Sequence, residues 1–276
     1  MKTTKFLFLF IILALASCKD QEKKQPEVED GKPDEVESIS VKPLEETRVI
    51  NLPLNDNDTS LTINNIQFTY EGAEFDNTKG SYIQTSSKDL NINDGIGINT
   101  VFNFSERDGA KAQTLFSMVD ANSATGTAAF TFYISNRRIT GVAQGKFLWG
   151  NDYTYNKGMS DVFFDSPQLE IDKYYSLSIN ITSEKIELFV NNELYQEFNN
   201  LSIQKLKGDH IVLGAFKKPQ DPAGSKILKG KIRNLEIYNR SLTLDEIDDY
   251  YLINQGEMNE QNDALALEQM EKSNEN

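Results

Sequence analysis

The stretch Gly230–Tyr251, "GKIRNLEIYNRSLTLDEIDDYY", reads as a β-strand that runs directly into a helix, and it decides the fold. Ile232 and Leu235 are both apolar but lie three residues apart, so they cannot share one face of a regular strand. Leu235 and Ile237 resume the alternation. This change of parity predicts a β-bulge near Arg233–Asn234.

The helix start within this stretch carries two separate signals. Thr243 and Glu246 have the spacing of a capping box, in which each side chain accepts the backbone N–H of the other residue. Leu242 and Ile247 occupy the flanking positions of a hydrophobic staple. The sequence therefore predicts that a short helix begins at Thr243.

The segments before this stretch alternate apolar and polar residues with the period of strands. Clear examples are Phe130–Ser135, Ile96–Phe104 and Tyr175–Val190, the last with a tight turn at Ser183–Glu184. Asn191–Asn192 predicts a second turn, because Asn tolerates the positive φ of two-residue hairpin loops. Such segments predict an all-β fold, a sandwich of antiparallel sheets. No repeat of 20–50 residues is visible, which argues against a propeller or solenoid.

The ending of the chain resembles the terminal motif of LamG-like jelly-roll domains in the concanavalin A-like lectin/glucanase superfamily. The matching residues are Gly230, Ile232, Ile237, Tyr238, Asn239, Arg240, Leu242, Glu246 and Ile247. The resemblance covers roughly Arg48 to Asn254 and implies a concanavalin A-like jelly-roll β-sandwich with a short C-terminal helix. We expect the domain to occupy residues 47–254.

The resemblance also implies a possible structural Ca²⁺ ion, although no cofactor is certain. The family commonly places an acidic pair where this chain has Arg233–Asn234. Asn234 still offers an oxygen ligand, and Asp76 lies in the segment that usually faces it. The alternative is an empty corner held by hydrogen bonds. Asp76 and Asn234 are therefore the candidate calcium ligands.

The N-terminus predicts a lipoprotein signal peptide over residues 1–17. Lys2 and Lys5 precede an apolar stretch, Phe6–Leu15, that is too short to span a bilayer, which takes about 20 residues. The following Leu-Ala-Ser-Cys resembles the lipobox of bacterial lipoproteins, which implies lipidation of Cys18. An ordinary secretory signal is the alternative. Cys18 is the single cysteine of the 276 residues, so no intramolecular disulfide can form.

Both ends of the mature chain are polar. Residues 18–46 are charged and poor in apolar residues, which predicts a disordered acidic tether between Cys18 and the domain. Residues 255–276 predict a polar, disordered tail. The net charge of the chain is −14, which argues against nucleic acid as a partner because nucleic acids require concentrated Lys and Arg.

Catalytic residues are not expected. Glucanase relatives carry Glu-x-Asp-x-x-Glu on one strand, whereas here Glu170 and Asp172 are followed by Tyr175 at the third position. His210 is the single histidine, which argues against a His-based triad or a zinc site. The sequence thus predicts a protein that is not an enzyme, with a glycoside hydrolase or lyase as an alternative.

An aromatic segment offers a candidate ligand site. Trp149, Tyr153 and Tyr155 lie among Gly and Asn residues, as in a sugar-binding loop that combines a flat apolar platform with hydrogen-bonding groups. The alternative is that these rings belong to the core. The sequence as a whole predicts a lipoprotein of a bacterial cell envelope, in the outer membrane or at the cell surface. Its predicted partners are a membrane, through the lipid, and carbohydrate, or else an extracellular protein or a structural role in the envelope.

Overall fold

The fold is described from a computed structural model. The described residues are 42–56, 60–88, 90–106, 112–120, 128–143, 146–148, 167–199, 201–203, 205–218 and 221–274. They belong to one compact unit, Lys42–Asn276. No helix among these residues is long and apolar enough to cross a membrane.

Two antiparallel sheets form the body of this unit. The first has the order β14-β13-β12-β7-β19-β4-β3, with β1 also paired to β19, and the second has the order β11-β10-β9-β8-β16-β5-β2. The strands of the first sheet are β1 (Arg48–Pro53), β3 (Gln67–Thr69), β4 (Gly72–Asp76), β7 (Ile96–Phe102), β12 (Tyr175–Ile181), β13 (Ile186–Val190), β14 (Glu193–Phe198) and β19 (Lys229–Tyr238). Those of the second are β2 (Thr62–Asn64), β5 (Tyr82–Ser86), β8 (Gln113–Val119), β9 (Phe130–Ser135), β10 (Arg138–Ala143), β11 (Lys146–Leu148) and β16 (His210–Leu213).

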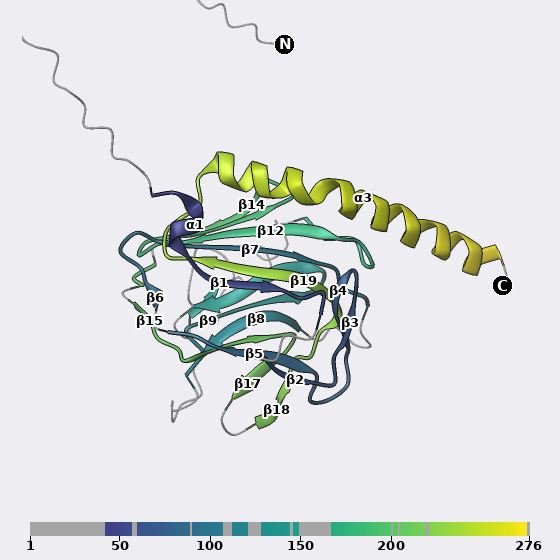
Figure 1. Ribbon diagram of the computed structural model, residues 1–276, viewed down its shortest axis with the longest axis horizontal. Coiled ribbons are helices and arrows are strands. Elements are labelled where there is room, and N and C mark those ends of the chain that lie inside the picture. Colours follow the sequence, from purple (N-terminus) through teal and green to yellow (C-terminus); the bar gives the residue numbers. More distant parts are fainter. Residues whose placement is uncertain are drawn as a thin grey trace, which may run out of the picture. The chain divides into compact units, whose positions relative to one another are not determined.

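The remaining elements are short pairs of strands and two helices. β6 (Leu90–Asn91) pairs with β15 (Lys205–Leu206), and β17 (Phe216–Lys218) pairs with β18 (Asp221–Ser225). Helix α1 covers Leu44–Thr47, and helix α3 covers Leu244–Asn274. Figure 1 shows α3 running along the eight-stranded sheet and continuing past its end.

The core lies between the two sheets. One apolar cluster takes residues from both sheets, for example Ile98 and Ile179 from the first and Phe116 and Phe132 from the second. All four are fully buried. The alternation in each strand therefore places one apolar face against the other, which confirms the predicted β-sandwich of antiparallel sheets followed by a helix.

Strand β19 contains the predicted bulge. The register between β19 and β7 shifts between Ile232 and Asn234. Along its other edge, β19 pairs first with β4, through Lys229–Ile232, and then with β1, through Asn234–Tyr238. β1 and β4 therefore lie end to end along one edge of β19.

The predicted turn and helix start are also confirmed. Asn191 and Asn192 have φ of 50° and 60°, as a tight hairpin turn requires. At the start of α3, the Thr243 N–H donates to Glu246 Oε2 at 2.9 Å, and the Glu246 N–H donates to Thr243 Oγ1 at 3.2 Å. The staple residue Leu242 is buried in the same apolar cluster as Ile247.

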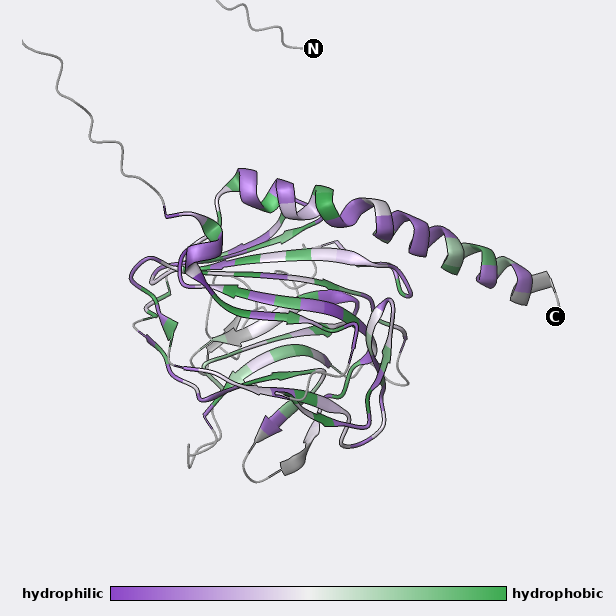
Figure 2. Cartoon of the chain, viewed as in Figure 1, coloured by the Kyte–Doolittle hydropathy of each residue, from purple (hydrophilic) through white to green (hydrophobic). Residues whose placement is uncertain are grey.

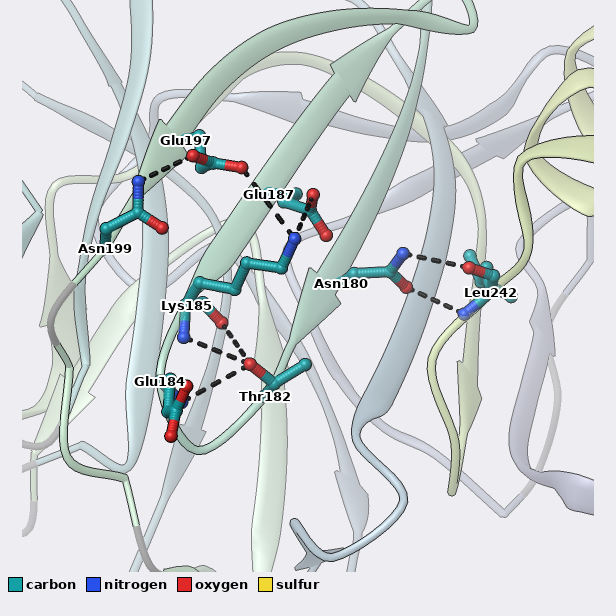
Figure 3. A network of polar contacts seen from close by, with 8 residues as sticks. All are labelled: Asn180, Thr182, Glu184, Lys185, Glu187, Glu197, Asn199 and Leu242. Atoms are coloured by element: carbon teal, nitrogen blue, oxygen red, sulfur yellow. Dashed lines mark hydrogen bonds and ion pairs between the residues drawn. The ribbon is translucent and has the colours of Figure 1, made fainter. Parts of the chain in front are cut away.

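A buried asparagine holds the residue before this cap. Asn180 on β12 donates from Nδ2 to the Leu242 carbonyl at 3.0 Å and accepts the Leu242 N–H at 2.8 Å (Figure 3). It thus binds the Leu242 backbone as a neighbouring strand would. On the same sheet, Lys185 bridges Glu187 and Glu197.

The structure corrects the predicted limits of the folded domain at both ends. Residues 255–274, predicted to be a disordered tail, are part of α3, although Figure 2 shows that most of this helix is hydrophilic. The helix continues because Met258 and Leu265 pack in one cluster with Val101 and Tyr174 on the sheet. Residues 42–46, assigned to the tether, include the start of α1, and Leu44 packs against the cluster beside the cap.

Candidate functional site

The bulge in β19 turns two consecutive side chains toward α3. The Arg233 guanidinium donates to Glu257 Oε2 at 2.8 Å and also bonds the Gln261 carbonyl oxygen. Next to it, Asn234 Oδ1 accepts the Tyr250 hydroxyl at 2.9 Å. Successive residues of a regular strand point to opposite faces, so this double attachment depends on the bulge.

The anchors beneath α3 are buried. Burial raises the pKa of the Tyr250 hydroxyl, so it remains a donor to Asn234. The Arg233 guanidinium lies 5.8 Å from the centre of the Tyr174 ring, within the range of a cation–π contact. Asn262 accepts the Tyr174 backbone N–H at 2.7 Å. These contacts fix the helix on the sheet and with it every side chain that α3 presents nearby.

The turn between β3 and β4 faces the same part of α3. Thr69 Oγ1 accepts the Glu71 N–H at 3.2 Å and donates to the Gly72 carbonyl at 3.1 Å, which closes the turn. Gly72 has φ +123°, and a Cβ there would lie 2.5 Å from the Ile232 carbonyl oxygen on β19, so only glycine fits. Tyr70 is held at the tip of this turn with 85% of its surface exposed.

Tyr70 and α3 together line a groove of about 320 Å³. Its lining residues are Tyr70, Glu257, Glu260, Gln261 and Ala264. We call this the Tyr70 groove. Leaving out β11, no other aromatic side chain in the described part of the chain is as exposed as Tyr70.

The groove offers both a hydrogen-bond donor and hydrogen-bond acceptors beside the Tyr70 ring. Gln261 is only 8% exposed, and its carbonyl oxygen is occupied by Arg233. Its amide nitrogen donates to no described residue and is thus available to a ligand. The carboxylates of Glu257 and Glu260 are acceptors. An exposed ring next to both donors and acceptors suits a ligand with apolar faces and hydroxyl edges.

Two larger grooves lack such a ring. One, of about 530 Å³, lies between α3 and the turn that contains Glu170 and Asp172. The other, of about 470 Å³, is lined by β1, β5 and residues around Leu90. Neither has an aromatic residue in its lining. Among the described residues, the Tyr70 groove therefore fits a ligand with an apolar face best.

Glu170 and Asp172 lie in a turn before β12 and not on a strand. Glu170 pairs with Lys173 at 2.9 Å, and Asp172 Oδ1 accepts a hydrogen bond from Ser105. Asp172 has a positive φ of 55°, which a tight turn requires. The two carboxylates thus have partners within the fold.

The candidate calcium ligands do not lie together. Asp76 is paired with Lys229 on β19, and Asn234 lies five residues further along the same strand. At the rise of a β-strand, Lys229 and Asn234 are roughly 16 Å apart, so Asp76 and Asn234 are well separated. Asp76 accepts hydrogen bonds from Thr78 and Ser81, mainly the Thr78 backbone N–H, and these lower its pKa. Asn234 anchors α3 instead. No three His, Cys, Asp or Glu side chains gather into a metal site within the described ranges.

The remaining predicted site residues fall where the structure gives no description. Cys18 and the aromatic residues Trp149, Tyr153 and Tyr155 lie outside the described residues, so their roles stay predictions. Tyr70 and Gln261 are not among the site residues predicted from the sequence. Tyr70 stands alone in a turn, and Gln261 lies in the predicted tail, so neither belonged to a recognisable pattern.

The fold defines the class of protein: a β-sandwich of two antiparallel sheets with a helix along one of them. Residues 66–254 match the family described as "Sialidase, N-terminal domain", and the chain belongs to this family. The match includes Tyr70 and β19 but ends before Glu257. The coarse prediction of an all-β sandwich is confirmed, while the family shown is the sialidase N-terminal domain.

Solved structures support the fold. The ligand-binding domain of botulinum neurotoxin serotype D, described in complex with N-acetylneuraminic acid, has 15% identity and a TM-score of 0.53 over 75% of this chain and 51% of that one. Trypanosoma rangeli sialidase has 12% identity and a TM-score of 0.54 over 76% of this chain and 33% of that one. The chain therefore spans about half the length of the first and a third of the second. A comparison with curated protein sequences gives no match.

Proposed function

We propose that this protein is a non-catalytic carbohydrate-binding module that binds its ligand in the Tyr70 groove. The observation that carries the proposal is the 85% exposure of Tyr70 beside the Gln261 amide, which donates to no described residue, and two carboxylates held by α3. Membership of the sialidase N-terminal domain family supports a carbohydrate ligand. So does the sialic acid bound by one structural neighbour, although that neighbour is twice as long as the matched region.

A binding assay with a matched control tests the proposal. Tyr70→Ala should lower the affinity for a glycan about tenfold, or about 1.4 kcal/mol, because it removes the stacking surface. Leu194→Ala is the control: Leu194 is 57% exposed on β14, at the opposite edge of the same sheet. Both variants should unfold within about 0.5 kcal/mol of the wild type, as surface changes usually do.

The assay should begin with a glycan array and continue with titration calorimetry of the best ligand. Equal affinities for wild type and Tyr70→Ala would refute the assignment of the groove. Absence of binding to any glycan on the array would refute the carbohydrate function itself and favour a protein partner.

We further propose that the module is anchored to a bacterial envelope membrane through a lipid on Cys18, with a polar tether ahead of the folded unit. The support is the residue pattern of the first 18 residues. Cys18→Ser should abolish the lipid modification and release the protein into the soluble fraction. Fractionation and intact mass measure this, and a variant that stays with membranes at unchanged mass would contradict the anchor.

A further inference from the structure

The charges that face solvent in the Tyr70 groove are negative. In the ion pair between Arg233 and Glu257, the arginine side chain is 11% exposed and the glutamate side chain 72%. The positive partner is thus buried behind the carboxylate. Glu260, one turn further on, is exposed and forms no ion pair with a described residue. The nearby Glu71 is already paired with Lys231.

This arrangement discriminates between classes of sugar. An acidic sugar would bring its carboxylate close to the exposed carboxylates of Glu257 and Glu260, and like charges repel. An ammonium group would be attracted to Glu260 and to the face of the Tyr70 ring, since aromatic faces attract cations. The Gln261 amide would still donate to a sugar hydroxyl.

On the basis that the groove binds carbohydrate, we infer that its ligand class is an amino sugar with a free, protonated amine. Each feature of the groove then has a counterpart in the ligand. The Tyr70 ring contacts the apolar face of the sugar, Gln261 a hydroxyl and Glu260 the ammonium group. A basic peptide shares the ammonium but lacks the flat face and the hydroxyl.

The test compares three probes of equal length: a glucosamine oligomer with free amines, the same oligomer fully N-acetylated, and an oligolysine. The variants are Glu260→Gln, which removes charge but keeps shape, and Tyr70→Ala. Affinities are measured by calorimetry at mildly acidic pH and at two salt concentrations. Wild type should prefer the free-amine oligomer about two- to fivefold over the acetylated one, the range for an exposed ion pair. The preference should shrink at high salt.

Glu260→Gln should bind both oligomers equally and retain its affinity for the acetylated one, while Tyr70→Ala should bind both about tenfold more weakly than the wild type. A wild type that binds both oligomers equally, or prefers the acetylated one, overturns the inference and leaves the carbohydrate function in place. Oligolysine binding as tight as that of the free-amine oligomer overturns it too, because charge alone would then suffice. No binding of either oligomer overturns the inference as well, and the glycan array then decides the carbohydrate function separately.

Discussion

Replacing Asn180 should destabilise the protein more than its position on the sheet alone suggests. Asn180 is 6% exposed and binds both backbone groups of Leu242, which is itself 5% exposed. In Asn180→Ala, the buried backbone N–H and C=O of Leu242 both lose their hydrogen-bond partner. Each such group costs about 1–3 kcal/mol when left unsatisfied, so the total is about 2–6 kcal/mol. We expect the lower half of this range, because water entering the vacated space can replace part of the lost bonding.

Asn199→Ala provides the matched control for this prediction. Asn199 also donates its side-chain amide, to Glu197 at 2.6 Å, but on the exposed surface (Figure 3). Its removal should change the free energy of unfolding by no more than about 0.5 kcal/mol. Urea unfolding followed by circular dichroism measures both variants, and hydrogen exchange at the Leu242 amide reports the local effect. A loss of less than about 1 kcal/mol for Asn180→Ala, or a loss no greater than that of its control, would show that Asn180 is not needed to satisfy the buried Leu242 backbone groups.

Four further changes test other parts of the structure. Thr243→Ala should cost about 1 kcal/mol through loss of the helix cap, so an unchanged urea midpoint would contradict the capping box. Thr131→Val should stabilise the protein by about 1 kcal/mol in thermal unfolding, because the buried Thr131 hydroxyl has no hydrogen-bond partner among the described residues, and a destabilised variant would contradict this. The pKa of the Glu246 carboxyl is lowered from 4.5, mainly by its hydrogen bonds to Arg240. The ionised carboxylate therefore stabilises the fold at neutral pH, and this stabilisation is lost as the pH falls below 4.5. Glu246→Gln should accordingly lose less stability on acidification than the wild type. Trp149→Ala should cost about 3–5 kcal/mol if the ring is core, whereas a loss of glycan binding with near-wild-type stability would support the platform hypothesis.

Local signals account for the parts of the fold that could be predicted. The alternation in β7 and β12, the shift of parity at Ile232–Leu235 and the spacing of Thr243 and Glu246 each depend on neighbouring residues, so they can be read directly from the chain. These signals place the sandwich, the bulge and the helix start correctly.

The helix beyond residue 254 could not be predicted because its contacts are long-range and largely polar. Asn262 binds the Tyr174 backbone, and Gln261 binds Arg233, so two of its anchoring positions look like solvent-exposed residues in the sequence. The apolar positions are too sparse to give a helical period. The Tyr70 groove depends on the same contacts, which is why the candidate site cannot be predicted from the sequence alone.

β1 covers the half of one edge of β19 with which β4 does not pair. Asn234–Tyr238 pair with β1 on that side, so a chain that began at Leu54 would present the N–H and C=O groups of this segment to solvent. Unpaired strand edges are templates for another strand. Loss of residues 48–53 would therefore do more than shorten the chain: it would open a place beside β19 for a strand from a second molecule, and the shortened chain would self-associate.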